Sequence, residues 1–159
     1  MKLPEGNSFV IRPAVIQDLE ELTAIDALCF APGIAYPREE IQYLLSSSSI
    51  VTLVAERSSV IIGFGALARR LSRQNARCGE LVTIEVLPAF RRESIGAALH
   101  QALESRLREW GGSSLHLHVA VDNAAALSFY RGLGYRVVSR IPRYHLRKLD
   151  AWEMEKILT

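Results

Sequence analysis

The segment from residue 91 to residue 97 has the residue types that bind a phosphate group. It consists of Arg91-Arg92-Glu93-Ser94-Ile95-Gly96-Ala97 and lies between a predicted strand and a predicted long helix. The first turn of a helix has backbone N–H groups without partners and the positive end of the helix dipole, so it attracts an anion. Arginine adds charge-assisted donors. An ordinary basic loop, with Gly96 serving helix packing, is the alternative interpretation.

The elements that must position this segment follow from hydrophobic periodicity. A capping box at Asp18–Glu21 predicts a helix that continues to Cys29, and Asn123 is a predicted cap of a short helix through Tyr130. The best helix has one apolar stripe from Ile95 to Trp110 and ends at Gly111-Gly112. A further short helix is predicted at 38–45, and strands at 9–13, 50–56, 60–69, 79–87, 115–121 and 135–140. Residues 151–158 fit a strand or a helix.

This order predicts an α/β domain with a mixed, mostly antiparallel sheet flanked by helices. The strands at 79–87 and 115–121 are joined through the long helix, so a right-handed crossover makes them a parallel central pair. Along 115–121 the leucines and valines alternate with His116 and His118, which therefore share the opposite face.

Composition restricts the function classes. The chain has 159 residues, of which 49% are hydrophobic, and we expect one domain over 1–159. The net charge of +2 does not resemble the basic surface of a nucleic-acid-binding protein. We found no apolar run of ~20 residues that predicts a membrane span, no signal peptide, and no metal-ligand spacing around Cys29 or Cys78. A cytoplasmic protein without nucleic-acid or membrane partners is expected.

Several motifs in order resemble the GNAT superfamily of N-acetyltransferases. The pyrophosphate loop of that family has the form Arg/Gln-x-x-Gly-x-Gly/Ala, and residues 91–96 stand in its place. The resemblance runs from about Phe9 to Leu158 and is closest to the protein N-terminal α-amine acetyltransferases of the ribosomal-protein-alanine type. The other matching segments are Ile84–Pro88, Asn123–Tyr130, Gly134-Tyr135, Asp150–Glu155, Cys29-Phe30 through Tyr36-Pro37, Leu117–Val119 and Arg143–His145.

The resemblance implies an acetyl-coenzyme A site without a metal. The backbone of Ile84, Glu85 and Val86 would pair with the pantetheine arm, the loop with its arginines would hold the pyrophosphate, and Asn123 would also touch the cofactor. Ser94 departs from the family, which has glycine there. If the position needs a positive φ, serine costs on the order of 1–2 kcal/mol; in helical space it costs little, and its hydroxyl can bind phosphate.

The same resemblance implies the groups that move protons. Tyr130 takes the position of the acid that donates a hydrogen bond or a proton to the leaving sulfur. His118 takes the position of the base, which is Glu or His in related enzymes. Glu80 is the competing base, because many members of the superfamily have a glutamate on this strand. An aromatic core residue, a sheet histidine and a solvated edge residue are the respective structural alternatives.

The acceptor side is implied by two loops. Tyr36, after the first helix, and Tyr144 and His145, before the final strand, would shape a peptide groove. Because no acidic cluster lies near these loops, a protein or peptide N-terminus is favoured over a polycation. The open alternatives are an acetyltransferase of a small-molecule amine and a non-catalytic acyl-coenzyme A-binding module. The sequence does not give the preferred peptide or the oligomeric state.

Overall fold

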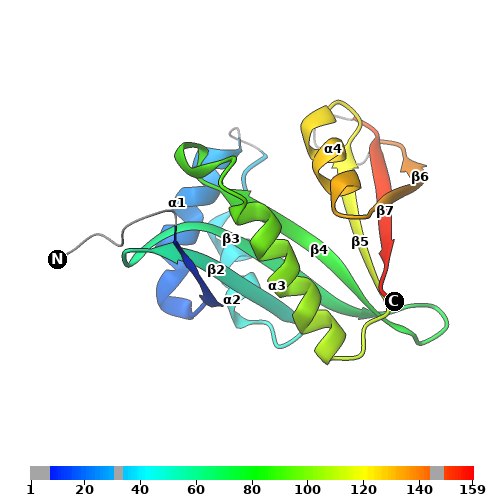
Figure 1. Cartoon of the computed structure of the whole chain (residues 1–159), viewed down its shortest axis with the longest axis horizontal. Helices are drawn as coiled ribbons and strands as arrows, with labels where there is room; N and C mark the ends of the chain where they lie inside the picture. Colours follow the sequence, from blue (N-terminus) through cyan, green and yellow to red (C-terminus); the bar gives the residue numbers. More distant parts are fainter. Residues whose placement is uncertain (1–7, 31–33, 144–148) are drawn as a thin grey trace. The chain divides into compact units, whose positions relative to one another are not determined.

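The computed structural model describes residues 8–30, 34–143 and 149–159. The predicted order of elements is confirmed, and the segment at 151–157, which periodicity left open, is a strand (Figure 1). The elements are β1 (Val10–Pro13), η1 (Ile16–Asp18), α1 (Leu19–Cys29), α2 (Arg38–Ser46), β2 (Ile50–Arg57), β3 (Val60–Leu71), β4 (Arg77–Val86), η2 (Pro88–Phe90), α3 (Ile95–Glu109), β5 (Ser114–Ala120), α4 (Ala124–Gly132), β6 (Arg136–Ile141) and β7 (Ala151–Ile157).

The described strands form a mixed sheet in the order β1-β2-β3-β4-β5-β7-β6. Strands β4 and β5 pair in parallel at Gly79–Leu115 and Glu80–His116, which confirms the predicted parallel pair. The pairs β1–β2, β2–β3, β5–β7 and β6–β7 are antiparallel. None of the helices in the described ranges is long and apolar enough to cross a bilayer.

The chain divides into two compact units. The first contains the chain up to Ala68 together with Val82–Arg106, and the second contains Arg69–Leu81 and Leu107–Thr159. Strands β3 and β4 and helix α3 each contribute to both units. The prediction of a single domain over the whole chain remains a prediction.

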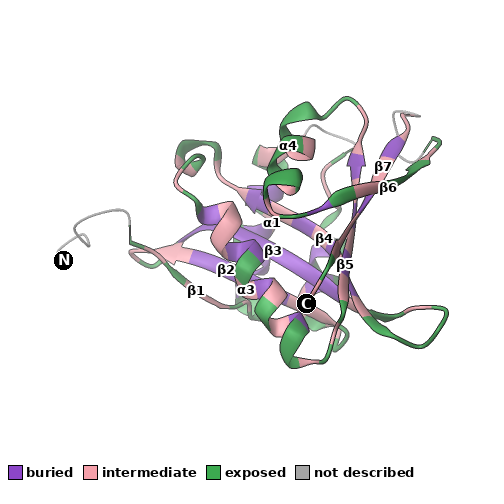
Figure 2. Cartoon of the chain, turned by 45° about the vertical axis from the view of Figure 1, so that its right-hand side comes forward, coloured by how far each residue is buried: buried purple, intermediate pink, exposed green. Residues whose placement is uncertain are grey.

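The core of the first unit lies on the strands β2 and β3. Helices α1 and α2 pack their buried leucines and isoleucines around Val54 and Phe64, which are completely buried. Helix α3 lies on the opposite face, because a side chain at Gly65, next to Phe64, would meet Leu103 of α3 at 2.9 Å. Figure 1 shows this layering, with α3 in front of β2 and β3 and with α1 and α2 behind. Figure 2 shows the buried residues concentrated along β2 and β3.

The core of the second unit lies between β5 and β7. Leu115, Leu117 and Val119 are buried at alternate positions of β5, as their period of two predicts. Leu117 pairs in register with Met154 of β7, which is also buried. His116 and His118 therefore face the opposite side of the same strand, where the side chains are half-buried.

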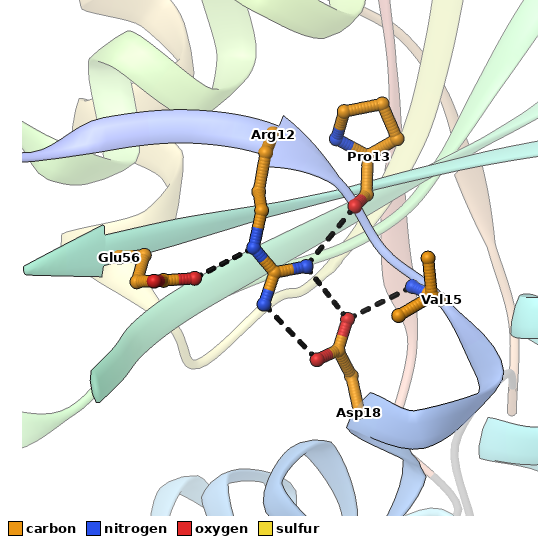
Figure 3. A network of polar contacts seen from close by, with 5 residues as sticks. All are labelled: Arg12, Pro13, Val15, Asp18 and Glu56. Carbon is orange, nitrogen blue, oxygen red and sulfur yellow. Dashed lines mark hydrogen bonds and ion pairs between the residues drawn. The ribbon is translucent and has the colours of Figure 1, made fainter. Parts of the chain in front are cut away.

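A network around Arg12 joins β1 to β2 and to the start of α1 (Figure 3). Its Nε donates to Glu56 Oε2 at 2.6 Å, and its terminal nitrogens donate to both oxygens of Asp18 at 2.9 and 3.0 Å. Asp18 is buried, and the hydrogen bond from Arg12 is the main reason that its pKa lies below the ordinary value. The network thus fixes the entry into the first helix.

The predicted capping box at Asp18–Glu21 is wrong. Asp18 makes no side-chain cap of α1, because it ends the preceding 3-10 turn η1. Its carboxylate turns back to accept the N–H of Val15 at 2.8 Å and the guanidinium of Arg12. An ion pair with a residue on another element therefore takes the side chain that the local pattern assigned to the helix.

We expect Asp18→Asn to lower the free energy of unfolding by about 1–3 kcal/mol at pH 7, because it weakens hydrogen bonds to a charged partner in a buried position. Because the pKa of Asp18 is lowered, its stabilisation is present above the unfolded pKa of ~3.9 and is lost as the pH falls through the lower folded value. Urea unfolding at pH 7 and pH 3 measures both effects.

The matched control is Glu20→Gln. It removes the ion pair between Glu20, on the exposed face of α1, and Arg38 at the start of α2. Such exposed pairs contribute about 0–1 kcal/mol. Equal losses for the two variants would show that the Arg12 network does not anchor the helix.

Candidate active site

The turn between η2 and α3 has the backbone shape of an anion site. Arg92 and Ser94 have left-handed φ values of 67° and 64°, and they flank Glu93. Left-handed residues in such a turn direct successive N–H groups towards one side, which forms a concave site for an anion. Serine therefore stands at a position that requires a positive φ, which is the costly one of the two cases considered for Ser94.

Helix α3 begins directly after this turn. The carbonyl of Ser94 accepts the N–H of Ala98 at 3.0 Å, so the helix starts with unpaired N–H groups at the turn. Ile95, Leu99 and Leu103 are buried and fix the helix on the sheet. Gly63 of β3 lets β4 come close, because a Cβ at this position would lie 2.8 Å from the Glu85 carbonyl oxygen. Packing therefore holds the turn in place.

Charged side chains around the turn are partly engaged with one another. Glu93 brings a negative charge close to the proposed phosphate position, and Arg57 of β2 lies 3.4 Å from its carboxylate. The Arg57 guanidinium also lies 5.5 Å from the centre of the Phe90 ring. Arg91 donates from Nε to the Val86 carbonyl at 3.1 Å. The turn thus combines backbone donors with exposed arginines at 91 and 92.

The end of β4 carries Ile84, Glu85 and Val86. The side chains of Ile84 and Val86 are half-buried, whereas Glu85 is buried at 3% exposure. The Glu85 carboxyl accepts a hydrogen bond from the Thr83 hydroxyl at 3.0 Å. Burial, followed by the neighbouring Asp26, raises the pKa of Glu85 to about 9.

Tyr36 follows α1 in the same unit and is tied to the core through its backbone. Its N–H donates to Asp26 Oδ2 at 2.6 Å, and its half-buried ring packs against the cluster beneath α1 and α2. The other predicted acceptor residues, Tyr144 and His145, lie outside the described residues.

The candidate bases lie in the second unit. Glu80 pairs in register with His116 of β5, and His118 follows two residues later on the same face. The Glu80 carboxylate accepts a hydrogen bond from Arg70 Nε at 2.5 Å. His116 contacts the Ser114 hydroxyl at 3.1 Å and lies 3.8 Å from Glu155, so it is a sheet histidine with local partners. His118 lies opposite Glu153 of β7.

The candidate acid Tyr130 lies on α4. Asn123 begins this helix, as predicted, by accepting the Ala126 N–H at 3.1 Å. Gly134, with a φ of 101°, turns the chain after the helix, so that Tyr135 donates its N–H to the Tyr130 carbonyl and packs its ring against Tyr130. Burial raises the pKa of Tyr130 to about 12, so the phenol stays protonated at neutral pH.

Sequence reasoning missed Asp26 and Arg57. Asp26 is a carboxylate within the apolar stripe that Leu22, Ile25 and Cys29 form on α1, and this unusual position was an available signal. Arg57 gives no local signal, because its partner Glu93 is 36 residues away in the chain.

Comparison with known proteins identifies the family. Residues 17–135 match the model of the Acetyltransferase (GNAT) family. An N-alpha-acetyltransferase of Sulfurisphaera tokodaii is 27% identical, over 94% of this chain and 93% of that protein. An IAA acetyltransferase of Azospirillum brasilense is 32% identical, over 79% of this chain and 78% of that protein.

A solved structure shares the fold. The ribosomal-protein-S18-alanine N-acetyltransferase of Escherichia coli superposes with a TM-score of 0.81 at 20% identity, covering 96% of this chain and 95% of that one. Together with the family match over most of the sequence, this confirms the predicted fold class. The chain therefore belongs to the GNAT family of acetyltransferases and is an enzyme that uses acetyl-coenzyme A as its acetyl donor.

Proposed function

We propose that the enzyme acetylates the α-amine at the N-terminus of a protein or peptide. The observation that carries this proposal is the similarity over nearly the whole length of both chains to an enzyme named N-alpha-acetyltransferase. The fold shared with an alanine N-acetyltransferase of a ribosomal protein agrees with it. A cytoplasmic location belongs to the same proposal, and the free thiols of Cys29 and Cys78 suit a reducing compartment.

In this proposal the turn at 92–97 holds the pyrophosphate of acetyl-coenzyme A. The left-handed residues Arg92 and Ser94 and the start of α3 support this role, because they supply backbone donors and a positive dipole. The backbone at 84–86 is the proposed partner of the pantetheine arm, and Asn123 at the start of α4 is a proposed cofactor contact. Tyr36 is a proposed acceptor-binding residue, and the predictions for Tyr144 and His145 stay predictions, because both lie outside the described residues.

His118 is the proposed base. Acetyl transfer needs a neutral amine, and histidine can take up the proton that the attacking amine releases. Glu80 is the weaker candidate, because one of its carboxylate oxygens already holds the Arg70 guanidinium at 2.5 Å. The amine nitrogen forms a bond to the acetyl carbon, the carbon–sulfur bond breaks, and the electron pair leaves on sulfur.

Tyr130 is the proposed group that receives this negative charge. A phenol with a pKa of about 12 gives its proton to a thiolate of pKa ~8.5 only at an energetic cost of roughly 5 kcal/mol. Its contribution is therefore mainly a hydrogen bond to the developing thiolate, and the proton that the thiolate finally takes up can come from His118, which has accepted it from the amine, or from water. A hydrogen bond that strengthens as charge develops stabilises the transition state more than the bound substrate.

A small-molecule acceptor is the second candidate. The observation that favours it is the higher identity, over a shorter aligned part, to an enzyme named IAA acetyltransferase. The cofactor site is the same in both cases, so only the acceptor distinguishes them.

We expect Ser94→Gly to bind acetyl-coenzyme A at least as tightly as the wild type and to melt at the same or a higher temperature. Glycine removes the left-handed cost of about 1–2 kcal/mol, which exceeds its own entropic penalty of about 0.5–1 kcal/mol. Ser94→Val should weaken binding and stability, because a branched Cβ is worse at positive φ. Calorimetric titration and thermal melts measure both. A large loss of affinity in Ser94→Gly would instead assign the phosphate contact to the serine hydroxyl.

Tyr130→Phe should leave the affinity for acetyl-coenzyme A unchanged and reduce kcat by ~10²–10⁴, the usual contribution of such a group. The matched control is Tyr135→Phe, which removes the hydroxyl of the ring packed against Tyr130 and should keep kcat within a few-fold. Steady-state kinetics with saturating cofactor checks this. Unchanged turnover in Tyr130→Phe would reduce the residue to packing.

Peptides with a free α-amine should be acetylated much faster than the same peptides N-terminally blocked but carrying lysine. The α-amine has a pKa near ~7.8 and lysine near ~10.4, so supplying neutral lysine at pH 7 costs ~3.5 kcal/mol more. His118→Ala should lose most of the activity, and Glu80→Gln less. Faster reaction of the lysine peptides or of small amines would overturn the assigned acceptor. A greater loss in Glu80→Gln would move the base to Glu80.

A further inference from the structure

Two carboxyl groups in the first unit are buried and have no part in the proposed chemistry. Asp26 of α1 is 0% exposed and Glu85 of β4 is 3% exposed. Within the described residues, Asp26 Oδ1 and Glu85 Oε1 have no hydrogen-bond partner. A buried polar atom without a partner is costly, so the two orphan oxygens need an explanation.

The other oxygen of each carboxyl group accepts a hydrogen bond. Asp26 Oδ2 accepts the N–H of Tyr36, and Glu85 Oε2 accepts the hydroxyl of Thr83. The two residues lie in the same part of the fold, because the sulfur of Cys29, three residues after Asp26 on α1, lies 3.6 Å from the carbonyl oxygen of Val86, which follows Glu85 on β4. In agreement with this, the Asp26 carboxylate contributes to the raised pKa of Glu85. Each orphan oxygen is an acceptor, and one proton between the carboxyl groups would satisfy both.

Electrostatics leads to the same result. Two unprotonated carboxylates in one buried place repel each other and lose their solvation, so one of them is kept neutral. Burial is the largest cause of the raised pKa of Glu85, and the Asp26 carboxylate is the next.

We propose that Asp26 and Glu85 share one proton. We also propose that this pair holds Tyr36, and with it the segment 34–37 on the acceptor side, against the strand β4. In the proposed site the pair links the acceptor side to the cofactor side. Through Tyr36 it holds residues 34–37, and through Glu85 it is part of the strand whose backbone at 84–86 faces the cofactor in the proposed site. We assign both as positioning residues, since both side chains are buried inside the first unit. The assignment of the acceptor side depends on the proposed function.

Other titratable and charged groups also face this pair. The Cys29 thiol of α1 lies 3.6 Å from the Val86 carbonyl, and burial, followed by the charge of Glu85, raises its pKa. Arg91 donates to the same carbonyl and acts in the opposite direction on Cys29. The thiol is protonated at neutral pH and therefore carries no charge there. The titration of the pair thus depends mainly on the interaction between its two carboxyl groups.

The shared proton is tested without any substrate. In the wild type the folded state keeps a proton that an unfolded glutamate loses above pH ~4.3, so stability falls as the pH rises from there towards about 9. In Glu85→Gln an amide N–H replaces the proton and does not titrate. We expect the melting temperature of Glu85→Gln relative to the wild type to increase steadily from pH 5 to pH 9. The control, Glu21→Gln on the exposed side of α1, should show a constant difference.

The positioning role is tested by kinetics. Glu85→Leu leaves the Asp26 carboxylate buried beside an apolar group, and we expect about a tenfold rise in the KM of the amine acceptor, with the KM of acetyl-coenzyme A unchanged. Glu85→Gln should restore the acceptor KM. Above pH 9 the acceptor KM of the wild type should also rise relative to that of Glu85→Gln. Because the amine titrates equally in both assays, the ratio of the two KM values does not depend on its titration.

A difference in melting temperature that does not change with pH would overturn the shared proton. An acceptor KM that is unchanged in Glu85→Leu, or that Glu85→Gln does not restore, would overturn the positioning role. If Glu85→Gln fails to fold, Asp26→Asn gives the same test, because its amide oxygen still accepts the Tyr36 N–H. The kinetic comparison uses whichever amine the enzyme acetylates. A wrong α-amine assignment would therefore show up in a different experiment, the comparison of acceptor amines, and not in this one.

Discussion

The turn that precedes α3 must hold two non-glycine residues, Arg92 and Ser94, in left-handed backbone conformation. Such conformations persist only where the surrounding structure fixes them. Here the fixing comes from the buried side chains at 95, 99 and 103, which seat the first turns of α3 on the sheet, and from Gly63 and Gly65 of β3, which let β4 and the helix approach. The same packing that overcomes the strain also fixes the unpaired N–H groups at the start of the helix, which is the proposed position of the diphosphate.

Candidate-site carboxylates in each unit are paired with an arginine. In the first unit Glu93, beside the proposed anion-binding turn, is near Arg57, and in the second unit Glu80 is near Arg70. The pair of Asp26 and Glu85 is different, because one oxygen of each carboxyl group has no hydrogen-bond partner among the described residues, and a shared proton is the neutralisation that we propose. A neutral hydrogen-bonded pair can be buried at much lower cost than two charges. It can therefore join α1, the segment after it and β4 inside the core.

The second unit depends on alternation along β5. The apolar residues at 115, 117 and 119 bury one face against β7 and leave His116 and His118 on the other. Since a shift by one residue would turn the histidines into the core, the register of this strand is strongly fixed. The helix α4 then carries Tyr130, whose ring is held by Tyr135 after the turn at Gly134. A protonated phenol and a histidine thus come from neighbouring elements of one unit.

The sequence by itself determined the order of elements, the parallel pair of β4 and β5, and the family, because these depend on local periodicity, turn residues and ordered motifs. It also identified Asn123 as a helix cap. The roles of the candidate site residues stay predictions. The tertiary structure alone decided that Asp18 binds Arg12 and does not cap α1, that Ser94 takes a positive φ, that Glu80 is engaged by Arg70, and that Asp26 and Glu85 are both buried. Each of these depends on which residue of a distant segment lies within a few ångströms, and in a buried place such a partner outweighs the preference of the local sequence.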